Sequence, residues 1–217
     1  MISNQSSEKL WGWWAMAHGG SVYVAYVFWL LIEEGCQAYS CGQDINRLLG
    51  GFSFIFFASL LGTLQLFILR QVLDINYSWS LVTGLSVIFA LFPIAVISLI
   101  ANSELPEIAP YSIHILRMLI AGSICGSIIG FMQWGILRKK VSNSGKWILL
   151  NIIGYSLGLG IFGWMIYPYS SFQDFIHRVE MLKENSILVM IFIAILLPGV
   201  FTGSIVNSFE PIDNNGV

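Results

Sequence analysis

The chain is dominated by six apolar runs, each long enough to cross a lipid bilayer. They lie near residues 10–32, 48–69, 79–100, 112–137, 147–167 and 187–207. A helix rises about 1.5 Å per residue, so about 20 residues cross a hydrocarbon core of about 30 Å. Backbone amides find no water in that core, and the runs lack the alternating pattern of barrel strands. Each run is therefore expected to be a helix.

Composition supports the same fold class. Charged residues make up 10% of the 217 residues and hydrophobic residues 56%, and the mean hydropathy is +0.76. A soluble domain carries about 25% charged residues. The first apolar run is too long for a signal peptide core and no small-x-small cleavage site follows it, so it is expected to be the first span. We predict an all-α integral membrane protein, with residues 1–217 forming one domain of six transmembrane helices.

Lysine and arginine positions predict the orientation, because cytoplasmic segments of membrane proteins are enriched in them. With a cytoplasmic N-terminus, the inner segments hold most of these residues, namely Lys9, Arg70, Arg138, Lys139, Lys140 and Lys146. The outer segments hold Arg47, Arg178 and Lys183, and Arg117 falls just inside the fourth span. Both termini are therefore predicted to be cytoplasmic, in an inner, plasma or thylakoid membrane.

Two of the three cysteines, Cys36 and Cys41, fall in the first predicted outer loop with four residues between them. An extracytoplasmic space permits disulfides, and such a spacing can close a small loop. The alternatives are a disulfide or two free thiols, and the sequence favours neither.

A repeat with an offset of 68 residues relates segments 58–90 and 126–158. Identical residues recur at this offset: Gly62 and Gly130, Gln65 and Gln133, Leu69 and Leu137, Arg70 and Arg138, Trp79 and Trp147. In the same frame Thr83 falls on Asn151. The repeat unit is a pair of helices.

More distant copies of the repeat are found in the sixth and first spans. Gly199 and Thr202 fit the Gly-x-x-Gln frame, and Trp14 and His18 fit the spacing of Trp147 and Asn151. If these are true copies, the protein consists of three helix pairs related by an axis along the membrane normal. Such an arrangement differs from the inverted repeats of many transporters.

The glutamines and glycines of the repeat are expected to join helices. Gly126, Gly130 and Gln133 share one helical face, because they recur at steps of four and three residues. Small residues let transmembrane backbones approach closely, and interhelical hydrogen bonds add to this packing. The polar positions of both copies are predicted to bridge the two helices of their hairpin or to bond exposed amides at the next helix start. They are Gln65, Gln133, Thr83 and Asn151.

Four tryptophans are expected at the same level as these polar residues. Each Gln lies five residues before an arginine, about 7 Å along the helix axis. Trp14, Trp79, Trp134 and Trp147 are predicted to form an interfacial aromatic belt there.

The second copy of the repeat resembles a module of known proteins. The unit Gly130-x-x-Gln133-Trp134-x-x-Leu137-Arg138, a short basic loop and Trp147-x3-Asn151-x2-Gly154 resembles uncharacterised multi-span membrane proteins that are commonly cyanobacterial. The likeness covers residues 126–158 and is degenerate over 58–90, where Leu66 replaces the Trp. The resemblance implies a membrane architecture and a photosynthetic bacterial source, and it transfers no catalytic residue.

Catalytic motifs do not occur in the sequence. It contains no phosphate-binding Gly-x4-Gly-Lys, no His-Glu-x-x-His and no Gly-x-Ser-x-Gly, so no enzymatic activity and no metal site are expected. His18 and His114 are candidate ligands for a pigment magnesium, although each is also explained as a hydrogen-bonded packing residue. The sequence therefore leaves any cofactor undetermined.

Two functions remain after these exclusions. The first is a non-enzymatic accessory or structural subunit of a larger, photosynthetic membrane complex, with the bilayer and other membrane subunits as partners and no nucleic acid. The second is a small-solute channel or transporter, in which polar residues form a ring near the cytoplasmic end. The ring would consist of His18, Gln65, Thr83, Gln133, Asn151 and Thr202.

Overall fold

A computed structural model of the protein describes residues 4–38, 43–104, 111–166, 185–206 and 209. Helices make up nearly all of these residues: α1 (Asn4–Ala38), α2 (Gln43–Leu69), α3 (Ser78–Glu104), α4 (Tyr111–Leu137), α5 (Gly145–Ile166) and α7 (Asn185–Val206). Each overlaps one of the six apolar runs, so the prediction of an all-α chain is confirmed.

The loops at one end of the molecule are short and hydrogen-bonded. After α2, the amides of Arg70 and Leu73 donate to the carbonyls of Leu66 and Leu69. Asn76 then accepts from the amide of Ser78 (3.2 Å) at the start of α3, the role of an N-cap residue. After α4, the amide of Val141 donates to the carbonyl of Leu137 (2.8 Å). These turns make α2–α3 and α4–α5 antiparallel hairpins.

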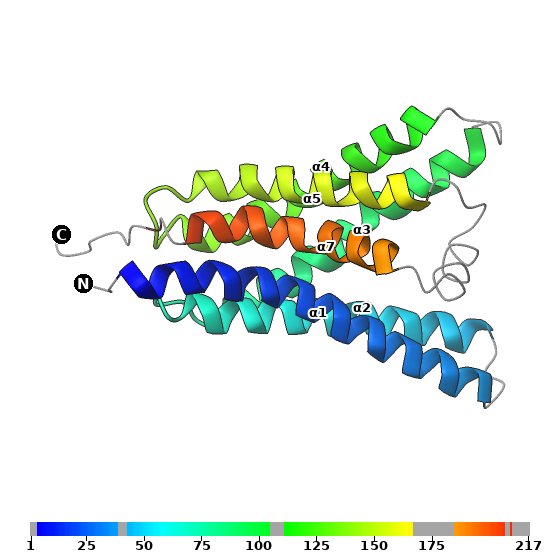
Figure 1. Ribbon diagram of the computed structural model, residues 1–217, viewed down its shortest axis with the longest axis horizontal. Coiled ribbons are helices and arrows are strands. Elements are labelled where there is room, and N and C mark those ends of the chain that lie inside the picture. Colours follow the sequence, from blue (N-terminus) through cyan, green and yellow to red (C-terminus); the bar gives the residue numbers. More distant parts are fainter. Residues whose placement is uncertain (1–3, 39–42, 105–110, 167–184, 207–208, 210–217) are drawn as a thin grey trace.

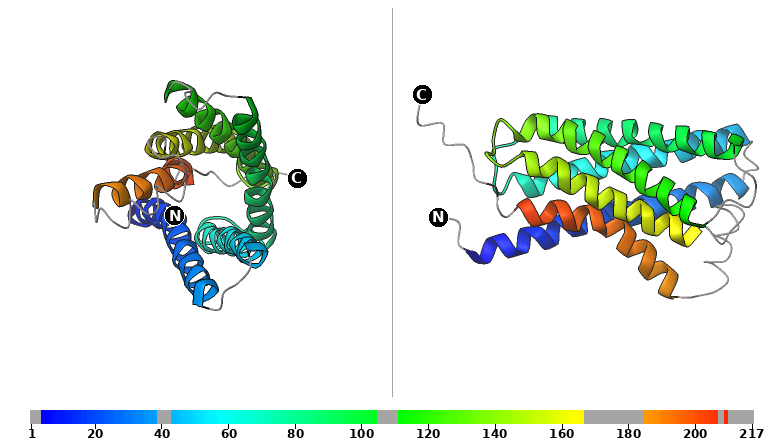
Figure 2. Two further views of the ribbon diagram at one scale, coloured as in Figure 1. Left: turned by 90° about the vertical axis from the view of Figure 1, so that its right-hand side faces the viewer. Right: turned by 90° about the horizontal axis from the view of Figure 1, so that it is seen from above.

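The helices form a closed ring. Each packs on the next in chain order from α1 to α5, α5 packs on α7, and α7 packs on α1. Figure 2 shows this ring seen from one end. In Figure 1, α1 begins and α7 ends at the same end of the molecule, and the helices diverge toward the other end. The contact between the first helix, α1, and the last, α7, therefore completes the ring.

Glycines allow the closest helix contacts. A Cβ on Gly126 of α4 would meet the backbone of Asn151 in α5, and a Cβ on Gly122 would meet the backbone of Tyr155. A Cβ on Gly154 of α5 would lie 2.7 Å from Cα of Pro198 in α7. Pro198 removes a backbone donor inside α7, which bends in Figure 2. Glycines thus lie at both contacts of α5, on α4 in the α4–α5 contact and on α5 in the α5–α7 contact.

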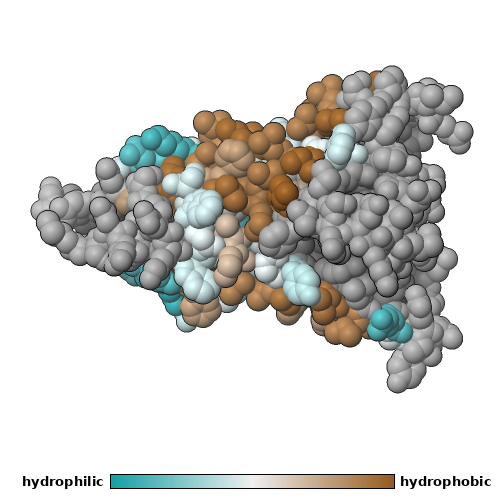
Figure 3. Space-filling model, viewed as in Figure 1, coloured by the Kyte–Doolittle hydropathy of each residue, from teal (hydrophilic) through white to brown (hydrophobic). Residues whose placement is uncertain are grey.

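The surface of the ring is apolar along its middle. Large hydrophobic side chains are exposed on the helices, among them Phe67, Phe89, Phe131, Leu149 and Trp164. Figure 3 shows a broad hydrophobic band, with hydrophilic side chains gathered near the end where α1 begins. Two described segments, Ile113–Leu137 and Gly145–Trp164, are long and apolar enough to cross a membrane.

Candidate functional site

Three tryptophans meet inside the ring near the end where α1 begins. The side chains of Trp14, Trp79 and Trp147 are 0% exposed. Trp147 packs edge-on against both others, at centroid distances of 5.5 Å to Trp14 and 5.9 Å to Trp79. The prediction of an interfacial belt is therefore wrong for these three residues, because their rings face the core and not the surface. Trp134 is partly exposed on α4.

The indole N–H groups of these tryptophans bond to a set of buried polar side chains. We call the combined set the polar layer; it consists of Trp14, His18, Gln65, Trp79, Thr83, Gln133, Trp147 and Thr202. All eight are at most 5% exposed. They come from six different helices, α1, α2, α3, α4, α5 and α7. The layer therefore joins every described helix of the ring.

Gln133 makes three of the hydrogen bonds in this layer. Its Oε1 accepts from Nε1 of Trp147 (2.9 Å), which closes the α4–α5 hairpin. Its Nε2 donates to Oγ1 of Thr83 in α3 (2.9 Å) and to Oε1 of Gln65 in α2 (3.3 Å). Two of the three bonds therefore leave its own hairpin, and the bond to α2 crosses the interior of the ring.

Gln65 repeats part of this pattern. Its Oε1 accepts from Nε1 of Trp79 (3.3 Å), which closes the α2–α3 hairpin. Its Nε2 lies 3.1 Å from Nε2 of His18 in α1. Each glutamine thus bonds the tryptophan of its own hairpin and a residue of the preceding helix in the ring.

The hydrogen bonds of His18 define its protonation. Its Nδ1 lies 3.1 Å from the carbonyl oxygen of Trp14, which can only accept, so Nδ1 carries the hydrogen. Its Nε2 then accepts from the amide group of Gln65. Both ring nitrogens are engaged, which leaves none for the pigment magnesium considered above. A neutral imidazole fits this arrangement.

Thr202 takes the position of a glutamine in the α7–α1 contact. Its Oγ1 accepts from Nε1 of Trp14 (2.8 Å) and donates to the carbonyl of Pro198 (2.7 Å). The side chain is shorter than that of glutamine, so it bonds the tryptophan but does not extend to the preceding helix, α5. The third tryptophan therefore has a hydroxyl acceptor where the other two have an amide oxygen.

Glycines precede these three acceptors by three residues, and each meets the matching position of the adjoining helix. A Cβ on Gly62 would lie 3.1 Å from Cβ of Thr83, and one on Gly130 would lie 3.1 Å from Cβ of Asn151. A Cβ on Gly199 would lie 2.9 Å from Cγ of His18. The same contact thus occurs three times around the ring.

The remaining predicted site residues lie outside the polar layer. Asn151 is buried, but its Nδ2 donates to the carbonyl of Trp147 within α5 (2.9 Å), so this bond does not bridge helices. His114 is half-buried in the first turns of α4. Cys36 is buried near the end of α1, and Cys41 lies outside the described residues, so the disulfide stays a prediction.

Sequence reasoning missed the tryptophan–glutamine bonds and the bond between the two glutamines. One signal was present, because each tryptophan follows its glutamine by 14 residues in both copies of the repeat. No family model matches the chain, and no curated protein or solved structure matches it either.

The chemistry of the layer is that of neutral donors and acceptors. Every buried side-chain nitrogen and oxygen atom in the described part of the chain has a hydrogen-bond partner. The layer packs against a cluster of buried apolar side chains at the end of the ring where α1 begins. The cluster includes Leu10, Leu66, Leu69, Leu137, Val141 and Val206. The arrangement holds helices together, and its polar atoms bond one another.

Proposed function

We propose that all six helices span a membrane and that both termini are cytoplasmic. The two long apolar segments and the exposed hydrophobic band support this placement. The described loops at the end where α1 begins carry most of the exposed lysines and arginines, as expected for a cytoplasmic face. This membrane placement is tested with single-cysteine variants at Ser142 and Asn102, labelled in sealed vesicles with a reagent that does not cross the membrane. The two cysteines are expected to react from opposite sides of the membrane, and reaction from the same side would contradict the placement.

The architecture that we propose is three helix pairs: α2–α3, α4–α5 and α7–α1. Its support is the threefold recurrence of two contacts, the tryptophan–acceptor bond and the glycine contact three residues before it. In this arrangement the first helix of the chain is the second member of the third pair. The chain is then a circular permutation of three consecutive hairpins.

As its function, we propose a non-enzymatic, structural or accessory subunit of a larger membrane complex. The observation that carries this proposal is the polar layer, whose side chains bond one another across the interior of the ring. Such a layer fixes the relative positions of the helices and leaves the apolar exterior for other subunits and lipid. The resemblance to cyanobacterial proteins makes a photosynthetic complex the first partner to test.

Purification in mild detergent, followed by mass spectrometry of co-purifying proteins, tests this function. Stoichiometric membrane-protein companions are expected, and the Gln133→Leu variant should retain them although it is less stable. An absorption spectrum of the same preparation tests for bound pigment. Purification of the protein alone, together with solute flux in liposomes, would contradict the proposal.

A channel or transporter is the second candidate, favoured by the convergence of polar groups from all six helices on the interior. Gln65 and Gln133 come from helices that are not neighbours in the ring, so their hydrogen bond lies across any central path. Conduction would require this bond to open. The Gln65→Leu and Gln133→Leu variants should then change the flux of the purified protein in liposomes, whereas a structural role predicts none.

A further inference from the structure

Two arginines at equivalent positions of α2–α3 and α4–α5 each lie over an aromatic side chain, at the end of the helix ring where α1 begins. Arg70 follows α2 and Arg138 follows α4, and both are exposed. Cζ of Arg70 lies 4.3 Å from the ring centroid of Tyr77, and Cζ of Arg138 lies 5.0 Å from that of Trp134. Each guanidinium is therefore stacked on an aromatic side chain of its own copy of the repeat.

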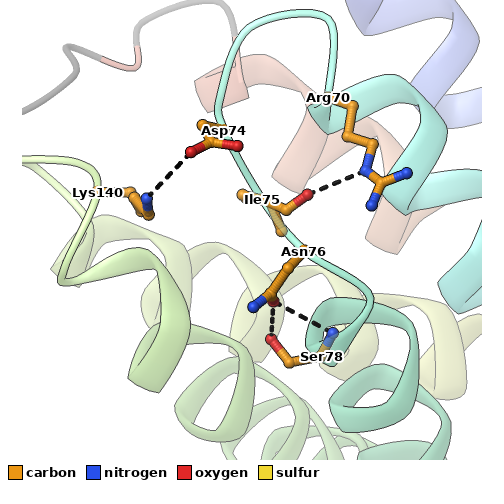
Figure 4. Close-up of polar contacts among 6 residues, drawn as sticks. All are labelled: Arg70, Asp74, Ile75, Asn76, Ser78 and Lys140. Carbon is orange, nitrogen blue, oxygen red and sulfur yellow. Dashed lines mark hydrogen bonds and ion pairs between the residues drawn. The ribbon is translucent and has the colours of Figure 1, made fainter.

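Arg70 is fixed by a second contact. Its Nε donates to the carbonyl oxygen of Ile75 (3.0 Å), in the turn before α3 (Figure 4). The nearby carboxylate of Asp74 points the other way and lies 3.7 Å from Nζ of Lys140. Among the described residues, neither arginine has a carboxylate within ion-pair distance. The planar guanidinium groups are thus oriented, and no carboxylate of the described residues neutralises their charge.

The surface next to each arginine changes from apolar to basic along the helix. On α4, Phe131 is 61% exposed and its ring lies 5.5 Å from that of Trp134, and Arg138 follows one turn later. Steps of three and four residues put these three side chains on one face. On α2, the exposed Phe67 precedes Arg70 by three residues. This order matches the acyl chains, interfacial region and phosphate of a phospholipid.

We propose that Arg70 and Arg138 each bind the phosphate of an anionic phospholipid in the cytoplasmic leaflet. A guanidinium presents several N–H donors in a plane and bonds phosphate oxygens in a bidentate manner, which an ammonium does not. The anionic surface of that leaflet attracts basic side chains near it. The exposed apolar side chains that precede each arginine along its helix favour a lipid over free phosphate. This inference rests on the membrane placement proposed above.

Native mass spectrometry of the full-length protein tests the inference. Protein exchanged into mixed micelles with phosphatidylglycerol and phosphatidylcholine is expected to retain the anionic lipid selectively. Arg70→Gln and Arg138→Gln should each lower its retention about twofold, and the double variant should abolish the selectivity. Arg138→Lys should resemble Arg138→Gln, because it keeps the charge and loses the planar fork. Unchanged thermal stability of these variants confirms that they are folded.

Lys146→Gln is the matched control, because Lys146 is an exposed cation at the same end of the ring. It should leave retention unchanged; an equal loss in this variant would overturn the inference in favour of unspecific charge. Displacement of the lipid by millimolar inorganic phosphate would overturn it in favour of a free anion site. Alkaline extraction of cell membranes separates the two proposals. A protein that stays in the membrane without lipid selectivity refutes only the arginine sites, and a protein that leaves it refutes the membrane placement.

Discussion

The hairpins α2–α3 and α4–α5 carry equivalent residues at the polar layer and different residues farther along the helices. At the layer, Gln65 bonds Trp79 as Gln133 bonds Trp147. Farther along, α4 has glycines at 122 and 126, where α2 has Phe54 and Ala58. The two hairpins therefore share the bonds of the layer, whereas the distance between the two helices differs from one hairpin to the other.

The glycines decide this difference in packing. A Cβ on Gly126 would meet the carbonyl of Asn151, which belongs to the backbone and cannot rotate away. A Cβ on Gly84 of α3 would lie 3.9 Å from the carbonyl of Ala58, an ordinary contact. α4 and α5 are thus packed backbone to backbone at Gly122, Gly126 and Gly130. In α2–α3 such a contact occurs at Gly62, where a Cβ would lie 2.7 Å from the carbonyl oxygen of Ser80, and it does not extend to Gly84. The comparison indicates that α4–α5 depends on glycine and that both hairpins depend on the layer.

The largest expected effect comes from filling the close contact in α4–α5. Gly126→Ala should destabilise the protein by about 2–3 kcal/mol, because the two backbones must separate. Gly84→Ala should be neutral or stabilise by up to about 1 kcal/mol, because alanine favours helix more than glycine. Thermal unfolding in detergent measures both. Equal effects of the two substitutions would show that the hairpins do not differ in packing.

Loss of either glutamine should have the next largest effect. Gln133→Leu and Gln65→Leu should each destabilise by about 1–3 kcal/mol, because a buried indole N–H loses its acceptor. The double variant should lose less than the sum, since the two side chains share a hydrogen bond. The same unfolding measurement gives the coupling. Gln71→Leu is the control, because Gln71 is exposed at the same end; strict additivity would argue against the shared bond.

The third helix pair should depend less on its acceptor. Thr202→Val keeps the shape of the side chain and removes the hydroxyl that accepts from Trp14. A loss of about 1 kcal/mol is expected, the lower end of the range for the glutamines, because Thr202 makes one hydrogen bond to another helix whereas each glutamine makes three. Ser204→Ala, at an exposed position of the same helix, should have no effect. Tryptophan fluorescence follows the unfolding of both variants, and an unchanged stability of Thr202→Val would show that the α7–α1 pair does not depend on this hydrogen bond.

Circular permutation should have the smallest effect. Joining the chain ends through a flexible linker and opening the chain between α1 and α2 turns the three proposed pairs into three consecutive hairpins. Stability should change by less than about 1 kcal/mol, because only loop closure is altered. The permutant should give the same tryptophan fluorescence as the parent protein. A permutant opened inside α5 is the control that should not fold, and equal failure of both would contradict the proposed pairing.

Much of the fold could be predicted from the sequence because it depends on local properties. The length of each apolar run, together with the need of backbone amides for partners, specifies six helices near the observed ranges. Short basic loops specify antiparallel neighbours, as seen for α2–α3 and α4–α5. The offset of 68 residues in the sequence also relates Gln65 to Gln133 and Trp79 to Trp147.

The face that each side chain presents was decided only by the tertiary structure. A tryptophan near a helix end is equally suited to a lipid interface and to a core, and the two environments leave the same sequence pattern. Trp14, Trp79 and Trp147 are buried because the helices of the ring surround them, and each indole N–H meets an acceptor on an adjacent helix. The sequence by itself determined which residues form a repeated set. The closed ring determined that Gln133 bonds Thr83 and Gln65 in other helices, since the partner of a buried amide depends on which helices surround it.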